Sequence, residues 1–168
     1  MKIPDLEKLI EFTSADLNKI AQNVLKAHKD DVRKNARGPK GKFKELSNKP
    51  LNVYNGLSYK QYKQKTFNNN TPNLYASGDM FNAIKVQGKP KVGKEFSVKY
   101  GITDTKEAKK LNRHMHGKGV PKRAISEKDK PIPDPAVEIL LDGIASVIKK
   151  NFQKITKLGI QVVRILKD

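Results

Sequence analysis

The stretch from Leu74 to Ile125 most constrains the fold, because it contains two runs in which apolar and polar residues alternate. In the first run Ile84 and Val86 alternate with polar residues, and the second run places apolar residues at Phe96, Val98, Tyr100 and Ile102. A glycine- and lysine-rich segment, residues 88–93, separates them. Alternation with a period of two is typical of a half-buried strand. The stretch therefore predicts a β-hairpin with a long basic tip.

Turn and cap signals surround this hairpin. Ser77-Gly78-Asp79 predicts a turn, since glycine adopts positive φ and Ser or Asp can cap one short helical turn. After the hairpin, residues 103–105 predict the cap of a short helix that reaches about His114. Residues 120–125 follow two glycines and predict a short third strand.

Two long helices are expected at the ends of the chain. Residues 5–34 carry apolar residues at three- and four-residue spacing, with a capping-box pattern at Thr13 where the element breaks, and His28 continues the apolar stripe at the edge of the core. The C-terminal helix is expected to start with Asp134 as N-cap and Pro135 at the first helical position, and to end at Gly159. Its apolar stripe is Val137, Leu140, Leu141, Ile144, Val147, Ile148, Phe152 and Ile155. Leu141→Asp is therefore expected to prevent folding, whereas Lys149→Asp, off the stripe, should be tolerated.

The segment between the N-terminal helix and the hairpin is irregular and basic. Residues 35–56 have no sustained period, and Phe43, Leu46 and Leu51 are expected to anchor them as occasional apolar contacts. Ser58 predicts the cap of a short helix over Tyr59–Lys65. The aromatic residues in this region alternate with lysines, which fits base stacking or, more commonly, packing against the hairpin.

Together these elements predict an α+β fold in which a small antiparallel or mixed sheet around the central hairpin is flanked by long helices. A chain of 168 residues fits one domain. Its parts are the N-terminal helix 5–34, the basic loop with a short helix 35–73, the hairpin core 74–126 and the C-terminal helix 134–158.

The net charge of +18 is distributed unevenly along the chain. Residues 33–65 hold ten bases and one acid, and residues 85–130 hold fourteen bases and five acids. A basic middle between balanced ends indicates a face that meets a polyanion or an acidic partner. Most of the bases are lysines, so a set of solvated loops explains the charge equally well. The expected contact residues are Arg33, Lys34, Arg37, Lys40, Lys42 and Lys44.

The sequence offers little catalytic chemistry, and we expect no enzyme and no cofactor. The chain has no cysteine, which excludes thiol catalysis and cysteine-based zinc sites. His114 and His116 form a histidine pair that would share one face of a strand, but no third ligand cluster lies near them. No apolar run is long enough to cross a bilayer.

An ordered series of motifs between residues 50 and 126 resembles the virion morphogenesis, or tail completion, proteins of Mu-type and other long-tailed phages. Tyr54 stands where that family has a tryptophan. Two alternative pairs match the family's His-x-x-Gly, namely His114 with Gly117 and His116 with Gly119. The main matching residues are Leu57, Ser58, Leu74, Ser77, Gly78, Met80, Ile84, His114, Gly117, Pro121 and Arg123.

This resemblance implies a structural virion protein that completes the tail end or forms the neck joining tail to head. It implies a homo-oligomeric ring around the DNA channel, contacts with connector and tail-tube proteins, and assembly in the host cytoplasm. In such a ring the basic segment faces either genomic DNA or an acidic protein surface; we favour the protein, because a strongly basic lumen would retain DNA. Two competing classes are a basic nucleic-acid-binding protein of ribosomal or nucleoid type and a metal-dependent nuclease.

Overall fold

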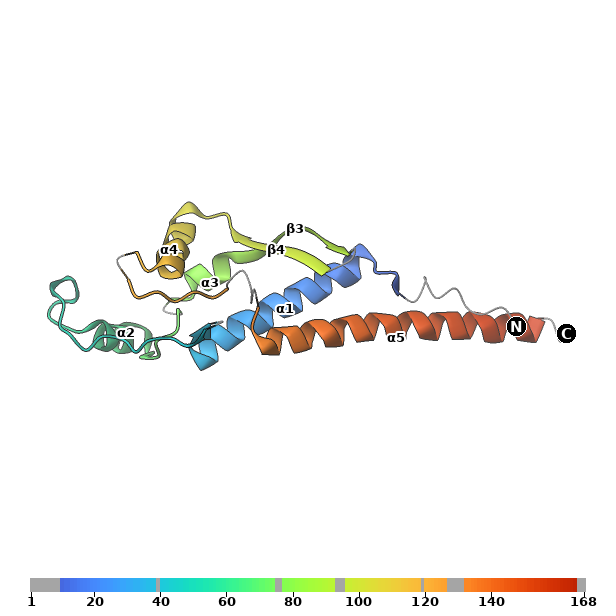
Figure 1. The fold of residues 1–168 in the computed structure, drawn as a ribbon, viewed down its shortest axis with the longest axis horizontal. Coiled ribbons are helices and arrows are strands. Elements are labelled where there is room, and N and C mark those ends of the chain that lie inside the picture. Colours follow the sequence, from blue (N-terminus) through green and yellow to red (C-terminus); the bar gives the residue numbers. More distant parts are fainter. Residues whose placement is uncertain are drawn as a thin grey trace.

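The structure is a computed structural model that describes residues 10–38, 40–74, 77–92, 96–118, 120–126 and 132–165. Figure 1 shows an elongated molecule, in which a hairpin and a short helix lie over one long helix and a second long helix runs along its other side. The elements are α1 (Ser14–Asn35), β1 (Arg37–Gly38), β2 (Gly41–Lys42), the 3-10 helix η2 (Asn52–Tyr54), α2 (Tyr59–Phe67), α3 (Asp79–Ala83), β3 (Ile84–Val92), β4 (Phe96–Ile102), α4 (Thr105–His116) and α5 (Asp134–Ile165). The predicted α+β class is confirmed, with two small antiparallel sheets, β1–β2 and β3–β4.

Local capping chemistry sets where three helices begin. At α1 the Thr13 side chain accepts from the backbone N–H of Asp16, whose carboxylate in turn accepts from the backbone of Thr13. Ser58 and Gln61 form the same reciprocal capping box at α2, and Asp104 caps α4. Each box satisfies backbone donors that the first helical turn leaves without partners. α1 begins at Ser14, after the predicted capping residue Thr13, and residues 11–13 are not helical; the part of the predicted helix before Ile10 lies outside the described residues.

The central hairpin is longer than predicted. β3 continues through the segment expected to break it, because Lys91 and Val92 pair with Ser97 and Phe96 of β4. A register irregularity between Gln87 and Lys91 accommodates Gly88, which has a φ of +69°. That conformation is readily adopted by glycine, so the glycine produces a bulge rather than a strand end.

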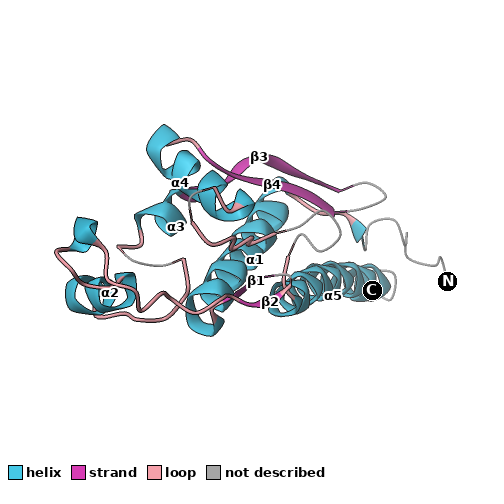
Figure 2. Ribbon diagram, turned by 60° about the vertical axis from the view of Figure 1, so that its left-hand side comes forward, coloured by secondary structure: helices cyan, strands magenta, loops and turns pink. Residues whose placement is uncertain are grey.

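α1 is the central element of the core, because it contacts both the hairpin and α5. One cluster of buried residues joins α1 to α3 and β3 through Leu25, Val32, Phe81 and Ile84. A second cluster joins α1 to α5 through Ile20, Val24, Ala136 and Val147. In Figure 2 the hairpin and α5 lie on different sides of α1. Most of the apolar surface of α1 is thus covered by these two partners.

α5 begins at Asp134, where the predicted helix 134–158 begins, but it is longer at its C-terminal end. It passes through Gly159 to Ile165. One glycine inside a helix costs only about 1 kcal/mol, which the rest of a 32-residue helix easily tolerates. At 1.5 Å per residue its length is about 48 Å, and Figure 1 shows it extending past the start of α1.

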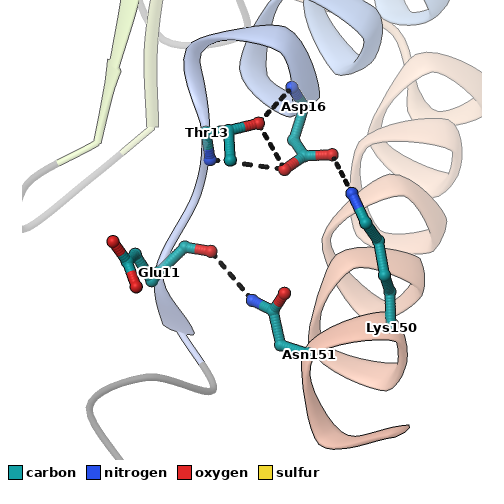
Figure 3. Close-up of polar contacts among 5 residues, drawn as sticks. All are labelled: Glu11, Thr13, Asp16, Lys150 and Asn151. Carbon is teal, nitrogen blue, oxygen red and sulfur yellow. Dashed lines mark hydrogen bonds and ion pairs between the residues drawn. The ribbon is translucent and has the colours of Figure 1, made fainter. Parts of the chain in front are cut away.

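Polar contacts hold α5 beside the start of α1 (Figure 3). The Lys150 ammonium donates to the carboxylate of Asp16 at 3.0 Å. One residue further along α5, the amide of Asn151 donates to the backbone carbonyl of Glu11 at 2.8 Å. The carboxylate that completes the Thr13 capping box therefore also pairs with α5, which links the start of one helix to the middle of the other.

Three further predictions about loops are corrected by the structure. Residues 120–126 contain no strand, because Arg123 donates its backbone N–H to the carbonyl of His114 at the end of α4 and not to a sheet. The loop after α1 contains the small β1–β2 hairpin. Phe43 and Leu46 are buried as expected, whereas Leu51, the N-cap residue of η2, is 42% exposed.

Candidate partner and polyanion interface

The motif residues of the central stretch build the core and its turns. Leu74, Met80 and Ile84 are buried in the cluster between α1 and the hairpin. Gly78 is the N-cap of α3 with a φ of +92°, so the turn predicted there depends on glycine rather than on a capping side chain. The exposed Ser77 hydroxyl instead donates to the carboxylate of Asp79 at 2.6 Å. These motif positions therefore determine the fold and do not form a catalytic cluster.

The motif residues after the hairpin fold the chain back along α4. Gly117 ends α4 with a φ of +71°. The backbone N–H of Arg123 then donates to the carbonyl of His114 at 2.8 Å. Pro121 lies exposed between them. The His-x-x-Gly and Pro-x-Arg motifs are thus two halves of one return loop, which brings Arg123 beneath the basic hairpin β1–β2.

Leu57 and Ser58 form a third group of motif residues, at the start of α2. Ser58 is buried and pairs with Pro50 in an isolated bridge, while the carbonyl of the half-buried Leu57 accepts from the backbone N–H of Leu51. In the same region Tyr54 stacks on Tyr62, with ring centroids 4.4 Å apart. These rings pack on each other and not against the central hairpin as predicted, because α2 lies away from β3 and β4 in Figures 1 and 2.

Two cations are buried near this junction, and the sequence did not predict their burial. Lys63 is 1% exposed and donates to the carbonyls of Thr71 and Asn73 and to the side chain of Asn73, at 2.7–3.2 Å. Burial lowers its pKa to about 8, and the nearby charge of Arg123 adds to the effect. The short helix around Lys63 is mostly polar in sequence and has no apolar stripe, so nothing in the sequence indicated that this lysine is buried.

Arg123 is the second buried cation, at 4% exposure. One terminal nitrogen, Nη2, donates to the carbonyl of Lys44 at 3.2 Å, while Nε has no hydrogen-bond partner among the described residues. Burial lowers the pKa of Arg123, yet a guanidinium stays protonated in proteins. Within the described part of the chain neither Arg123 nor Lys63 forms an ion pair with an acid. A positive charge therefore remains uncompensated at this junction.

The six bases expected to contact a partner do not form one patch. Arg33 pairs with Asp30, and Arg37 pairs with the buried carboxylate of Asp31 at 2.9 Å, so part of the predicted patch stabilises α1 instead. Lys34 is exposed in the last turn of α1. The remaining three are exposed and line a pocket together with two bases from the return loop, giving the set Lys40, Lys42, Lys44, Lys122 and Arg123. Lys122 was not among the predicted contact residues, although it is next to the motif residue Arg123 in the sequence.

The apolar stripe of α5 is only partly covered by α1. Val147 is buried and Ile144 is half-buried, as the stripe predicts. Leu141 is 59% exposed and Phe152 is 55% exposed. The prediction that Leu141→Asp prevents folding is therefore wrong, because a carboxylate at that position stays in water. An apolar strip on the outside of α5 is a candidate contact surface.

The three histidines do not come together in the structure. His28 is buried and donates from Nε2 to the carbonyl of Ile125 at 2.7 Å, as a histidine at the edge of the core would. Beside it, an apolar cavity of about 450 Å³ lies between α1, β4 and α4. His114 and His116 lie on α4 and not on a strand, so two residues' separation turns them about 200° apart. Among the residues that the structure describes, no three His, Cys, Asp or Glu side chains gather as metal ligands.

Comparison with known proteins gives no relative: no protein-family profile, curated protein or solved structure matches the chain. In the described ranges no helix combines the length and the apolar character needed to cross a membrane.

Proposed function

We propose that the chain is a structural protein of a tailed-phage virion, which completes the tail end or forms the neck between tail and head as a ring around the DNA channel. The observation that carries this proposal is the uncovered apolar strip of α5, formed by Leu141 and Phe152. A second copy of the chain is its expected occupant, and connector and tail-tube proteins are the expected neighbours along the axis.

The geometry of α5 suits contact with a neighbour. Leu141 and Phe152 are eleven residues apart, which is close to three helical turns, so they lie on nearly the same side about 16 Å apart. The strip borders the side that packs on α1, where Val147 is buried. A copy that docks here would continue the same core across the interface.

The motif series supports the same proposal from a second direction. Its residues lie at positions that determine the fold: buried core residues such as Leu74 and Met80, and the glycines Gly78 and Gly117 with positive φ. A series that determines turns and core contacts is a feature that members of a structural family would share. The resemblance thus concerns how the chain folds, and the α5 strip concerns how folded chains assemble.

The experiment is to measure mass by light scattering over a range of protein concentrations, for wild type and for Leu141→Asp/Phe152→Asp. We expect wild type to form closed rings, alone or with a connector or tail partner, and the double variant to remain monomeric with an unchanged circular dichroism spectrum. Lys149→Asp is the control, because its side chain is exposed on the same helix. A wild-type protein that stays monomeric at high concentration and is absent from purified virions contradicts the proposal.

The alternative is a basic nucleic-acid-binding protein of ribosomal or nucleoid type. The observation that favours it is the convergence of Lys40, Lys42, Lys44 and Lys122 on one pocket. Such a protein would bind DNA or RNA with a steep salt dependence, and it would stay monomeric at the concentrations at which the virion protein forms rings.

A further inference from the structure

A pocket of about 280 Å³ lies between the β1–β2 hairpin and the return loop after α4. Its walls come from two parts of the chain far apart in the sequence, residues 38 and 40–44 on one side and residues 122–124 on the other. The hydrogen bond from Arg123 Nη2 to the Lys44 carbonyl spans 79 positions and joins the two segments. The pocket is therefore a product of the tertiary fold.

Close packing fixes the walls of this pocket. A Cβ atom on Gly38 would lie 2.1 Å from the carbonyl oxygen of Ala124, so the hairpin and the return loop approach as closely as a glycine permits. On the hairpin side, Phe43 is buried and its backbone N–H donates to the carbonyl of Ala36 at 2.7 Å. Both walls are thus anchored to the body of the protein at the end of α1.

The lining of the pocket is strongly positive. Five of its residues are cations and none is an acid, namely Lys40, Lys42, Lys44, Lys122 and Arg123. The buried Arg123 keeps its charge, and its Nε has no partner among the described residues. Lys63, also buried, adds a second positive charge close behind Arg123. Charge that is removed from water without a counter-charge is costly, and an anion in the pocket would offset that cost.

We propose that this pocket binds a phosphate group of a nucleic-acid backbone. Four of the five cations are lysines, whose ammonium groups act as point charges toward phosphate and do not read base edges as arginine does. Lys40 lies in the turn of the β1–β2 hairpin, Lys42 lies on β2, and Lys44 follows two residues later. Several lysines gathered around a buried guanidinium suit a polyanion better than a single carboxylate.

The resulting contact is independent of base sequence. It extends the proposed function by naming what the basic hairpin meets, and it replaces our sequence-based preference for an acidic protein partner. The pocket is present in a single chain, so its binding can be measured on the free protein whether or not rings form. A failure of the phosphate site and a failure of the virion role are therefore distinguishable.

The test is the affinity for a fluorescently labelled random-sequence DNA duplex, measured by anisotropy at several salt concentrations. The pocket variant is Lys42→Gln/Lys122→Gln, and the control is Lys19→Gln/Lys149→Gln, which removes the same charge from exposed positions on α1 and α5. We expect the slope of log affinity against log salt to fall by about 2 in the pocket variant, since each phosphate contact contributes about 0.9. The slope of the control should match wild type.

A second measurement tests the site without DNA. Inorganic phosphate, compared with chloride at equal ionic strength, should raise the Tm of wild type and of the control but not that of the pocket variant, since a ligand that binds the folded state stabilises it. Equal loss of DNA affinity in both double variants overturns the proposal, because it would indicate diffuse attraction. Absence of DNA binding overturns it too, as does binding of polyglutamate in preference to DNA, which would identify an acidic protein partner.

Discussion

Both sides of α5 carry apolar residues, but only one side is buried in the fold. On the side that faces α1, Ala136 and Val147 are buried and Gly143 lies in close contact with Ile20. On the adjacent side, Leu141 and Phe152 remain mostly in water. The apolar stripe of α5 is therefore wider than the surface that α1 covers. The uncovered part is available for another contact. The first side stabilises the fold, and we infer that the second side supports assembly.

The largest expected effect is a loss of stability when a charge is placed on the buried side of α5. Val147→Asp places an unpaired carboxylate against Ile20 and Val24, which costs several kcal/mol of a total stability of about 5–15 kcal/mol. We expect this variant to lose its cooperative thermal unfolding transition, while Leu141→Asp unfolds close to wild type. The measurement is circular dichroism during heating at low protein concentration. Similar unfolding temperatures for the two variants would mean that the sides are not distinct.

A smaller effect tests the close approach of the two helices. A Cβ atom on Gly143 would lie 2.9 Å from Cγ1 of Ile20, so Gly143→Leu must push α5 away from α1. The better helix propensity of leucine offsets part of this strain, and we expect a net loss of about 1–2 kcal/mol. Ala145→Leu, at an exposed position of α5, is the matched control and should be nearly neutral. Urea denaturation measures both, and a Gly143→Leu variant as stable as the control would show that the contact is loose.

The start of α1, beside α5, should give an effect of about 1 kcal/mol. Thr13→Ala removes the side-chain oxygen that accepts from the backbone N–H of Asp16 at 3.1 Å. Ser14→Ala changes a neighbouring exposed residue that does not cap the helix and serves as the control. Urea denaturation of the two variants compares them. Equal stability would indicate that the packing of α5, not the cap, sets where α1 begins.

The smallest expected effect is a pH dependence of stability that comes from Asp16 at the start of α1. Hydrogen bonds from Thr13 and then from Lys150 lower the pKa of Asp16 below its ordinary value. The unfolded state therefore takes up the proton first as the pH falls, so this contribution is complete above about pH 4 and is lost as the pH drops through the lower folded-state pKa. An exposed pair of this kind contributes less than about 1 kcal/mol. Urea midpoints for wild type and Asp16→Asn should differ at pH 6 and converge toward pH 2; a difference that stays constant would contradict the pairing.

Several predictions that depend on neighbouring residues were confirmed, whereas the burial of one polar residue was not predicted. The capping residues Thr13, Ser58 and Asp104 are all placed as predicted, because a cap bonds to a backbone group three residues away. The alternating residues of the central hairpin are likewise paired in one antiparallel register. By contrast, Lys63 reads as an ordinary solvated lysine and is buried, since its acceptors come from a loop eight to ten residues further on.

The candidate interface was only partly predictable for the same reason. The basic character of residues 33–44 was evident from composition, but nothing local indicated that Arg37 pairs with Asp31 while Lys42 lines a pocket with Lys122. The expected third strand at 120–125 is a return loop because its backbone finds a partner at the end of α4. The shared pocket depends on contact between distant segments, and the other two outcomes depend on how the chain turns back after α1 and α4.

The sequence by itself determined the α+β class, the capped starts of the helices, the central hairpin and the basic middle of the chain. Each of these depends on residues within a few positions of one another, where spacing and side-chain type fix the chemistry. The tertiary structure alone decided which side of α5 is covered, that α5 continues through Gly159, and that Arg123 is buried beneath the basic hairpin. Burial depends on which surfaces meet, and a local pattern records how apolar a surface is without recording what covers it.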